Sequence, residues 1–451
     1  QSIQGRYGVV MSYNENQTPF EFESIKIIHS SEDGKPPIEL KLMVSDLDIF
    51  EHLDKPYLTA IMAFQDNRNI MNGGDVRGGD KVEIKIQNNS NTNPSRFVDK
   101  VFRIDKVMSA TRVDQNQNAE SIVLHLIENH WYESNARNVN QSYSGKVSEI
   151  LPKISSTYID KKEVQSTGED IQDVKVIVPN MTPIESMCWL KNRTTTKDGY
   201  PFYLYSSLLD NILHFKDLKT MMSEEPWNKG TPHSHISSNQ GLGDVQMRRT
   251  IKTYEYKNTD NLLTLINKGL VGAKHQYFNV TESEMSEVKF DIQKDVIKTF
   301  NIDGISDKNP LYSEGIKVAG KQLNTMESRV TTQISSTLAY GDDKNSYNES
   351  KETGDYKKNV MRRTMLGLMS NSPMTVTVNG FDFANGIENT IGSVMRISFL
   401  LTSFSQSSDK TFDPKRSGDY LVYSAKHSFK YEGYDVSLTC MKLNNDDFKV
   451  D

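Results

Sequence analysis

Two histidines separated by one residue, His233 and His235, form the pattern in this sequence that comes nearest to metal chemistry. Residues i and i+2 of a β-strand point to the same side, so the two imidazoles could ligate one ion there. No third ligand follows at a suitable spacing, and Pro, Gly and Ser residues between about 223 and 240 indicate a loop. The sequence therefore leaves metal binding open at His233 and His235 and favours two loop histidines without a metal.

A glycine-rich stretch, residues 73–80, is a second candidate, because backbone amides of such loops can cradle phosphates. The phosphate-binding arrangement needs a helix N-terminus directly after the glycines. Here Val82, Ile84 and Ile86 alternate with polar residues instead, which is the pattern of a strand. The stretch is therefore interpreted as a turn.

Paired carboxylates could perform general acid–base catalysis, and Asp46 with Asp48 and Glu224 with Glu225 are such pairs. Acidic residues are abundant in this chain, however, and spacing alone does not distinguish an acid pair from a solvated surface. His427 lies in an apolar strand pattern, where a hydrogen-bonded core or interface histidine is commoner than a catalytic one. The sequence contains no Ser-His-Asp spacing, Walker loop or Cys-x-x-Cys motif. We therefore expect no catalytic, cofactor-binding or metal residues, and a protein that is not an enzyme.

Composition narrows the class of protein further. The chain has 451 residues, and its net charge of −6 supplies no general attraction for the phosphates of nucleic acids. No stretch approaches the ~20 apolar residues of a membrane span, and residues 1–19 lack the apolar core of a secretion signal. Cys188 and Cys440 lie in separate apolar patterns and are expected to be reduced core residues. We expect several domains that fold in a cytoplasm, with no membrane contact and no stable binding of DNA.

The first β-domain is expected over residues 21–135, after a flexible arm at residues 1–20. Apolar and polar residues alternate in several short segments, for example residues 38–44, 82–86 and 122–126. Five or six such strands within about 110 residues, with turn residues between them, predict a compact antiparallel sheet or small barrel.

Residues 136–245 predict an α+β middle domain. Apolar residues repeat at helical spacing over residues 147–158, where Pro152 is expected to kink or divide the helix. Thr182-Pro183-Ile184-Glu185 is a capping box with proline at the first helical position. A hairpin-like pair of strands is expected over residues 201–215.

The last 200 residues divide into two parts. Residues 246–350 combine strand-like alternation with a long polar run that indicates an extended loop, and they are assigned to either the second β-domain or the middle domain. Residues 351–451 predict that second β-domain, which begins with an amphipathic helix over residues 355–370 and continues as strands. Four cations of this helix are placed on its polar side, Lys357, Lys358, Arg362 and Arg363. They either meet an acidic partner surface or keep the helix soluble, and the second interpretation is favoured.

Several local patterns together resemble one family. They are Gly79-Asp80-Lys81-Val82-Glu83-Ile84 at a strand start, residues 124–131 at the end of the first β-domain, residues 180–222 in the middle domain, and the closing strands at Gly418-Asp419-Tyr420-Leu421-Val422 and 434–443. With a β-rich unit at each end and an α+β unit between them, the chain resembles the central baseplate hub protein of T-even-type contractile phage tails. The segment 223–350 is longer than that family's usual connection, so the role of this insertion is left open.

The resemblance implies a mainly β, α+β fold with two tube-type antiparallel β-barrel domains, an α+β middle domain and a long polar insertion. In such hubs three chains present six barrels as a pseudo-hexameric ring, which adapts the sixfold tail tube to the threefold central spike and lets DNA pass. An acidic lumen that repels phosphates is our hypothesis for passage without specific DNA binding.

The implied partners are the chain itself as a homotrimer, the central spike protein, the tail tube and tube-initiator proteins, the tape measure protein and the baseplate wedge proteins. The implied location is the tail baseplate of a virion, after synthesis and assembly in the host cytoplasm. Two alternatives stay open: a tail-associated cell-wall hydrolase, and a hub-like component of a bacterial contractile secretion system.

Overall fold

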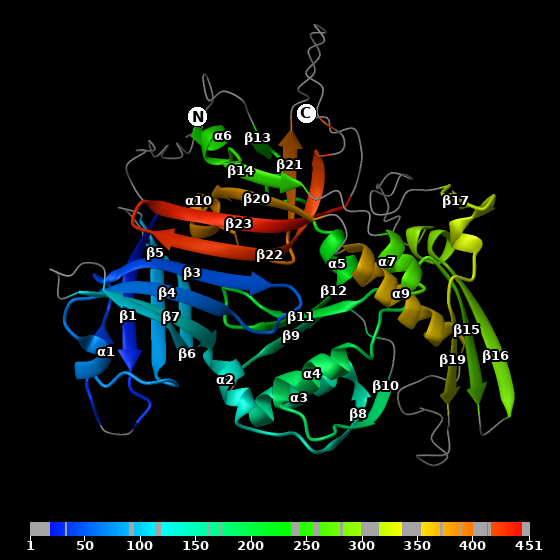
Figure 1. Cartoon of the computed structure of the whole chain (residues 1–451), viewed down its shortest axis with the longest axis horizontal. Coiled ribbons are helices and arrows are strands. Elements are labelled where there is room, and N and C mark those ends of the chain that lie inside the picture. Colours follow the sequence, from blue (N-terminus) through cyan, green and yellow to red (C-terminus); the bar gives the residue numbers. More distant parts are fainter. Residues whose placement is uncertain are drawn as a thin grey trace, which may run out of the picture.

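A computed structural model of the chain describes residues 19–31, 34–89, 94–112, 119–160, 162–168, 170, 173–235, 244–256, 262–279, 283–298, 315–335, 353–369, 373–387, 389–399, 413 and 416–443. Strands dominate and most of their pairings are antiparallel (Figure 1). The predicted mainly β, α+β class is thus confirmed. Among the described residues, no helix has the length and apolar character that crossing a membrane requires.

The first strands form a curved sheet, here called the N-terminal module. Its strands follow the order β3-β4-β7-β6-β5-β1-β2. On β5 and β7 every second residue is buried and its neighbours are partly exposed, because alternate side chains of a strand point to opposite faces. The elements are β1 (Phe20–Ile28), β2 (Ile38–Glu39), β3 (Val44–His52), β4 (Thr59–Asp66), α1 (Ile70–Gly73), β5 (Lys81–Asn88), β6 (Arg96–Arg112), β7 (Glu120–Glu128) and α2 (Asn129–Asn135).

The last strands, with two from the centre of the chain, form the C-terminal module. Its sheet follows the order β14-β20-β23-β22, and β21 pairs with both β22 and β13. The elements are β13 (His233–His235), α6 (Asp244–Arg248), β14 (Thr253–Tyr256), β20 (Pro373–Asn379), α10 (Phe381–Ala384), β21 (Val394–Phe399), β22 (Gly418–Lys430) and β23 (Gly433–Lys442). The loop predicted at His233 and His235 is wrong, because these residues pair in parallel with Ile397-Ser398-Phe399. A partner more than 160 residues away leaves no trace in local composition.

The two modules repeat one strand order. Counted along the chain, the main strands are β3, β4, β6 and β7 in one module and β14, β20, β22 and β23 in the other. In both, the spatial order is first, second, fourth, third. A short helix follows the second strand, and the next strand, β5 or β21, pairs with the third. β1 and β13 then lie outside β5 and β21, β1 in antiparallel and β13 in parallel pairing.

A direct strand pairing joins the modules. β22 pairs with β3, with Ser424–Lys430 opposite His52–Asp46. The strands β14-β20-β23-β22-β3-β4-β7-β6 therefore run as one antiparallel sheet, here called the eight-strand sheet (Figure 1). The described strands branch at β22, which pairs with β23, β21 and β3, and they do not close into a barrel. The sheet curves over a shared core, where Phe20 of β1 packs edge-on against Phe429 of β22 at 5.1 Å between ring centroids.

The middle domain has its own apolar core. Thr182 and Glu185 form the predicted capping box, but Pro152 does not divide its helix. The carbonyl of Ser148, which loses its helical donor to the proline, lies 3.4 Å from the Ser166 hydroxyl that donates to it. The elements are β8 (Ser142–Lys146), α3 (Val147–Tyr158), β9 (Val164–Thr167), β10 (Asp173–Ile177), α4 (Pro183–Lys191), β11 (Phe202–Ser206), β12 (Leu213–Asp217) and α5 (Leu218–Met222).

A further unit, here called the insertion unit, leaves the C-terminal module after β14 and returns before β20. Its three-strand sheet has the order β16-β15-β19. Part of the polar region predicted as an extended loop is thus ordered as short strands, while the run 341–352 lies outside the described residues. The elements are α7 (Leu262–Asn267), β15 (Gly272–Asn279), β16 (Glu284–Asp291), a π-helical turn (Gln293–Ile297), β17 (Lys317–Val318), β18 (Lys321–Gln322), a 3-10 turn (Leu323–Thr325), β19 (Val330–Ser335) and α9 (Thr353–Met369).

Candidate functional site

The third strand of each module is long enough to pair with two strands, one after the other, along the same edge. β22 pairs with β21 through Gly418–Leu421 and with β3 through Ser424–Lys430. β6 pairs with β5 through Arg96–Arg103. Its continuation, residues 105–112, has β7 on one side and no described strand on the other. On β22 this position is occupied by β3, whereas on β6 no described strand occupies it.

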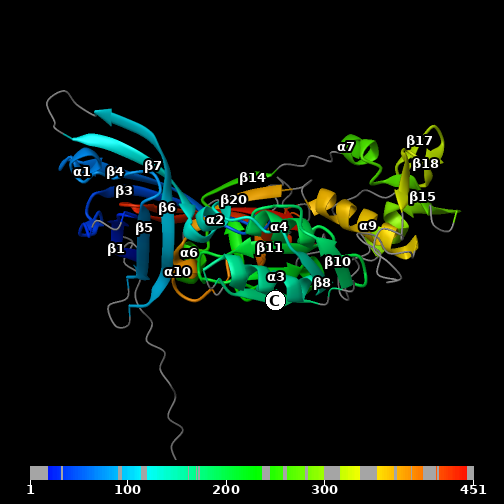
Figure 2. The ribbon, with the colours of Figure 1, turned by 90° about the horizontal axis from the view of Figure 1, so that it is seen from below.

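This open part of β6 is a surface suited to strand addition. All eight of its residues are exposed, and the β6–β7 hairpin extends beyond the rest of its module (Figure 2). Val107 and Met108 are 47% and 51% exposed. An edge strand with uncovered apolar side chains is a template for pairing with another chain. At the opposite end of the eight-strand sheet lies β14, the first strand of the C-terminal module.

The face of the eight-strand sheet turned away from the core, here called the outer face, is lined by hydroxyls. Thr377 and Ser437 lie 3.0 Å apart across neighbouring strands. A groove of about 420 Å³ runs over this face and is lined by Phe50, Glu51, His52, Lys55, Tyr57, Thr59, Thr375, Ser424, Ala425, Lys426, Ser437 and Thr439. Lys426 forms an ion pair with Asp48 at 2.8 Å. The predicted carboxylate pair Asp46 and Asp48 thus lies on a strand surface, and Asp48 has a lysine partner.

A buried hydrogen-bonded chain crosses the joint between the modules. Glu51 of β3 and His427 of β22 are fully buried, with 2.7 Å between Glu51 Oε2 and His427 Nε2. The other ring nitrogen of His427 lies 2.7 Å from the Tyr434 hydroxyl, and the backbone N–H of Leu208 donates to Glu51 Oε1 at 2.5 Å. Burial, with the nearby Glu51, raises the pKa of Tyr434 well above its usual range. His427 is confirmed as a hydrogen-bonded core histidine.

Glu128 forms a second buried network, which ties the N-terminal module to the middle domain. Its carboxylate accepts from the backbone N–H of Leu58 at 2.8 Å and from Lys162 at 3.1 Å. Lys100, 2% exposed, lies 3.7 Å away. Burial alone favours the neutral acid, but His130, Lys162 and Lys100 outweigh it and hold the pKa of Glu128 well below its usual range.

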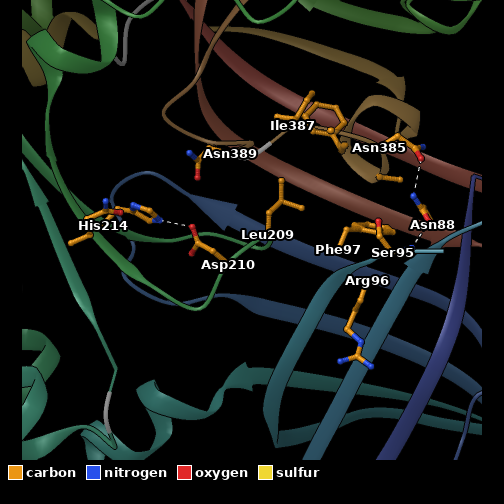
Figure 3. A pocket seen from close by; sticks show the side chains of 14 residues that line it. Asn88, Ser95, Arg96, Phe97, Leu209, Asp210, His214, Asn385, Ile387 and Asn389 are labelled. Atoms are coloured by element: carbon orange, nitrogen blue, oxygen red, sulfur yellow. Dashed lines mark hydrogen bonds and ion pairs between the residues drawn. The ribbon is translucent and has the colours of Figure 1, made fainter. Parts of the chain in front are cut away.

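A cavity of about 710 Å³ lies where both modules meet the middle domain (Figure 3). Asp210 and His214 form a 2.7 Å pair on one side, and the Asn88 amide donates to Asn385 at 3.0 Å on the other. Burial favours the neutral form of Asp210, but the His214 contact outweighs burial and lowers its pKa. Asp210 is the only carboxylate among the lining residues that the structure describes.

The predicted histidine pair does not share a ligand position. Burial lowers the pKa of fully buried His233 to about 4, and its Nδ1 lies 2.9 Å from the Asn228 amide. His235 stacks on Phe399 with ring centroids 5.7 Å apart. Within the part of the chain that the structure describes, no group of three His, Cys, Asp or Glu residues could hold a metal ion.

The remaining sequence candidates have structural roles. Residues 73–80 form the predicted turn, in which Gly79 has a φ of 89°. Glu224 and Glu225 pair with separate lysines rather than with each other. Cys188 and Cys440 are confirmed as free cysteines.

Among the cations of α9 whose side chains the structure describes, Lys358, Arg362 and Arg363, one departs from its prediction, and the side chain of Lys357 lies outside the described residues. Arg363 is exposed, as expected for the polar side of α9, but Arg362 is only 7% exposed. Its guanidinium faces Asn192 of the middle domain at 3.5 Å. The helical pattern did not reveal this burial, because the covering surface comes from a different unit.

Sequence analysis overlooked three buried charges that the alternation pattern could have revealed. Glu51 stands in phase with the core residues of β3, Glu128 with those of β7, and Lys100 with those of β6. A charged residue at a core position needs a buried partner. The pattern thus marks such residues as members of buried networks, although it does not identify their partners.

Comparison with solved structures finds similar folds at low sequence identity. The tail protein from Neisseria meningitidis MC58 has a TM-score of 0.53 at 10% identity, over 94% of this chain and 97% of that one. The 43 kDa tail protein of prophage MuSo2 from Shewanella oneidensis has a TM-score of 0.49 at 11% identity, over 94% and 99%. The Francisella PdpA-VgrG complex has a TM-score of 0.46 at 9% identity, over 97% of this chain and 54% of that one. No protein-family model and no curated protein matches the sequence. The first of these likenesses shows that the chain has the fold of a tail protein.

Proposed function

We propose that this chain is a structural baseplate hub subunit of a contractile phage tail, of the T-even type, and that three copies form a pseudo-hexameric ring. One observation carries the proposal: the chain contains the same strand order twice, fused through β22 and β3 into one sheet. The shared fold with a tail protein supports it. Two similar modules per chain let a trimer match both a sixfold tube and a threefold spike.

The pairing inside the chain supplies the template for the pairing between chains. Within one chain, β22, the third strand of the C-terminal module, pairs with β3, the first strand of the N-terminal module. Because the modules repeat one strand order, the open part of β6 in one copy pairs in the same way with β14, which lies at the end of the sheet of the next copy. The pairing of β5 with β6 ends at Arg103 and that of β21 with β22 ends at Leu421. Lys106 therefore corresponds to Ser424, where β3 begins to pair.

The size of such a ring suits DNA passage. Three sheets of eight strands give 24 strands. At ~4.8 Å per strand and a barrel tilt of about 40°, the circumference is roughly 150 Å, or about 48 Å across between backbones. The outer face then lines the lumen with hydroxyls, such as those of Thr377 and Ser437, and with paired charges, such as Lys426 and Asp48. This replaces the hypothesis of an acidic lumen with one of a nearly neutral wall. DNA then passes without specific binding.

The two barrel domains expected from the family are complete only in this assembly, because the open sheet edges are covered by ring neighbours. The proposed partners are the central spike protein on one side of the ring and tube-initiator and tube proteins on the other, with the tape measure protein inside and the wedge proteins outside. The proposed location is the tail baseplate of a virion. The role is structural rather than catalytic, and the purified chain is expected to release no fragments from peptidoglycan.

Mass photometry of the purified chain tests the ring. Wild type is expected to show a species at three times the chain mass of 51.3 kDa. Replacing both Val107 and Met108 with aspartate places charges on the open part of β6 and is expected to leave monomers. Leu42→Asp, at a residue 94% exposed outside the proposed joint, is the control and keeps the trimer. A wild type that stays monomeric up to micromolar concentration, or a double variant that still forms trimers, contradicts the proposed joint.

A further inference from the structure

The two modules differ most at one connection. Between their first and second strands, the N-terminal module has the short turn 53–58, whereas the C-terminal module has residues 257–372, which include the insertion unit. Helix α9 of this unit lies against the middle domain, where a Cβ added to Gly199 would lie 3.3 Å from the Met361 Cβ. The insertion unit therefore brings α9 to the end of α4, close to the equivalent turn of the other module.

At this contact the guanidinium of Arg362 is buried without a carboxylate partner among the described residues. It is 7% exposed, and its Nε is buried without a hydrogen-bond partner among the described residues. The 3.5 Å contact from Nη1 to Asn192 Oδ1 is long for a hydrogen bond. Burial, with Arg363 and Arg193 as like-charged neighbours, lowers the pKa of Arg362 to about 10. A buried guanidinium normally has a carboxylate partner.

Two further donor side chains, Arg363 and His275, lie near this contact. Arg363 is exposed beside it and forms no ion pair with a described residue. His275 of β15 is half-buried, and its burial, with the nearby charge of Arg363, lowers its pKa. Its Nε2 also has no hydrogen-bond partner among the described residues. The acid whose charge raises the pKa of Arg362 is Asp54, which already pairs with Lys191 at 2.5 Å. Positive charge thus exceeds negative charge at this contact, although the chain as a whole is acidic.

We propose that Arg362, Arg363 and His275 form a binding site for a side-chain carboxylate of an acidic partner protein. The planar guanidinium of arginine matches a carboxylate with two parallel hydrogen bonds. Arg362 is buried and its neighbour Arg363 is exposed, so a ligand that contacts both must reach inward on a side chain, as aspartate and glutamate do. The phosphates of a DNA duplex lie on a wide cylinder and reach only the exposed Arg363. The site therefore lets the insertion unit dock an acidic protein segment, and it is separate from the joint that forms the ring.

Fluorescence anisotropy with a labelled hexaglutamate peptide tests this site on the full-length chain. Wild type is expected to bind the peptide, and Arg363→Gln is expected to weaken binding about tenfold or more, because a charge-assisted hydrogen bond is lost. Arg363 is exposed, so its replacement leaves the fold intact. Arg362→Met keeps the apolar stem and is expected to weaken binding at least as much.

Lys289→Gln is the matched control, since Lys289 is a 74% exposed cation of the same unit. This variant is expected to bind the peptide as wild type does, and a DNA duplex is expected not to compete. The proposal is overturned if wild type fails to bind, if Arg363→Gln binds normally, if Lys289→Gln loses binding equally, or if duplex DNA displaces the peptide. Arg363→Gln also remains trimeric by mass photometry, which separates a failure of this site from a failure of the ring.

Discussion

Replacing Glu128 with glutamine keeps the side-chain shape and removes one buried negative charge. Glutamine can still bond to the Leu58 N–H, but Lys100 and Lys162 lose their carboxylate. Lys100 is 2% exposed and cannot turn to solvent without opening the contact between the N-terminal module and the middle domain. Removing one partner of a buried ion pair costs about 3–5 kcal/mol. We expect the free energy of unfolding to fall by this amount at pH 7.

Urea unfolding followed by tryptophan fluorescence measures this loss. Glu224→Gln is the control, because Glu224 also pairs with a lysine, Lys216, but is 41% exposed. Its effect is expected to stay within about 1 kcal/mol, as for other surface pairs. If Glu128→Gln changes the free energy of unfolding no more than this control does, the buried network does not stabilise the junction and our reasoning is refuted.

The pH dependence gives an independent check. Because the pKa of Glu128 is lower in the folded chain than in the unfolded one, its contribution is complete above the pKa of an unfolded glutamate, about 4.3. The contribution is lost as the pH falls from there through the folded pKa. The stability difference between wild type and Glu128→Gln is therefore expected to shrink below about pH 4.3. A difference that stays constant down to pH 3 contradicts the assignment.

Three further outcomes are expected. Thr182→Ala removes the side chain that caps α4 and should lower the free energy of unfolding by about 1 kcal/mol, whereas an unchanged urea midpoint rules out a stabilising cap. Gly380→Ala places a Cβ 2.1 Å from Cδ1 of Tyr434 and should cost about 1–3 kcal/mol or more; Gly230→Ala, with no atom within 4 Å, is its control. Burial raises the pKa of the Cys188 thiol to about 11. Iodoacetamide should therefore modify this thiol slowly at pH 8 in the folded chain and rapidly in urea. Equal rates in the two conditions contradict the burial.

Local patterns were sufficient for several elements. The capping box at Thr182 and Glu185 and the alternation of β5 and β7 act within a few residues, and the structure has them as predicted. Pro152 was expected to kink or divide its helix, and it does not divide it. The Ser166 hydroxyl that donates to the freed carbonyl comes from a neighbouring strand, a contact that the local pattern does not reveal. The short strand at His233 and His235 was missed for the same reason, since its partner β21 is remote in the chain.

The sequence by itself determined which side chains face a core, because the period of apolar residues depends only on neighbouring backbone geometry. The same alternation places charges such as Glu51 and Glu128 at core positions, although our sequence analysis overlooked them. Only the tertiary structure decided that β22 pairs with β3, that one strand order occurs twice, and that Arg362 of α9 is buried against the middle domain. These features depend on contacts between segments hundreds of residues apart, whose energies arise only when the whole chain has folded.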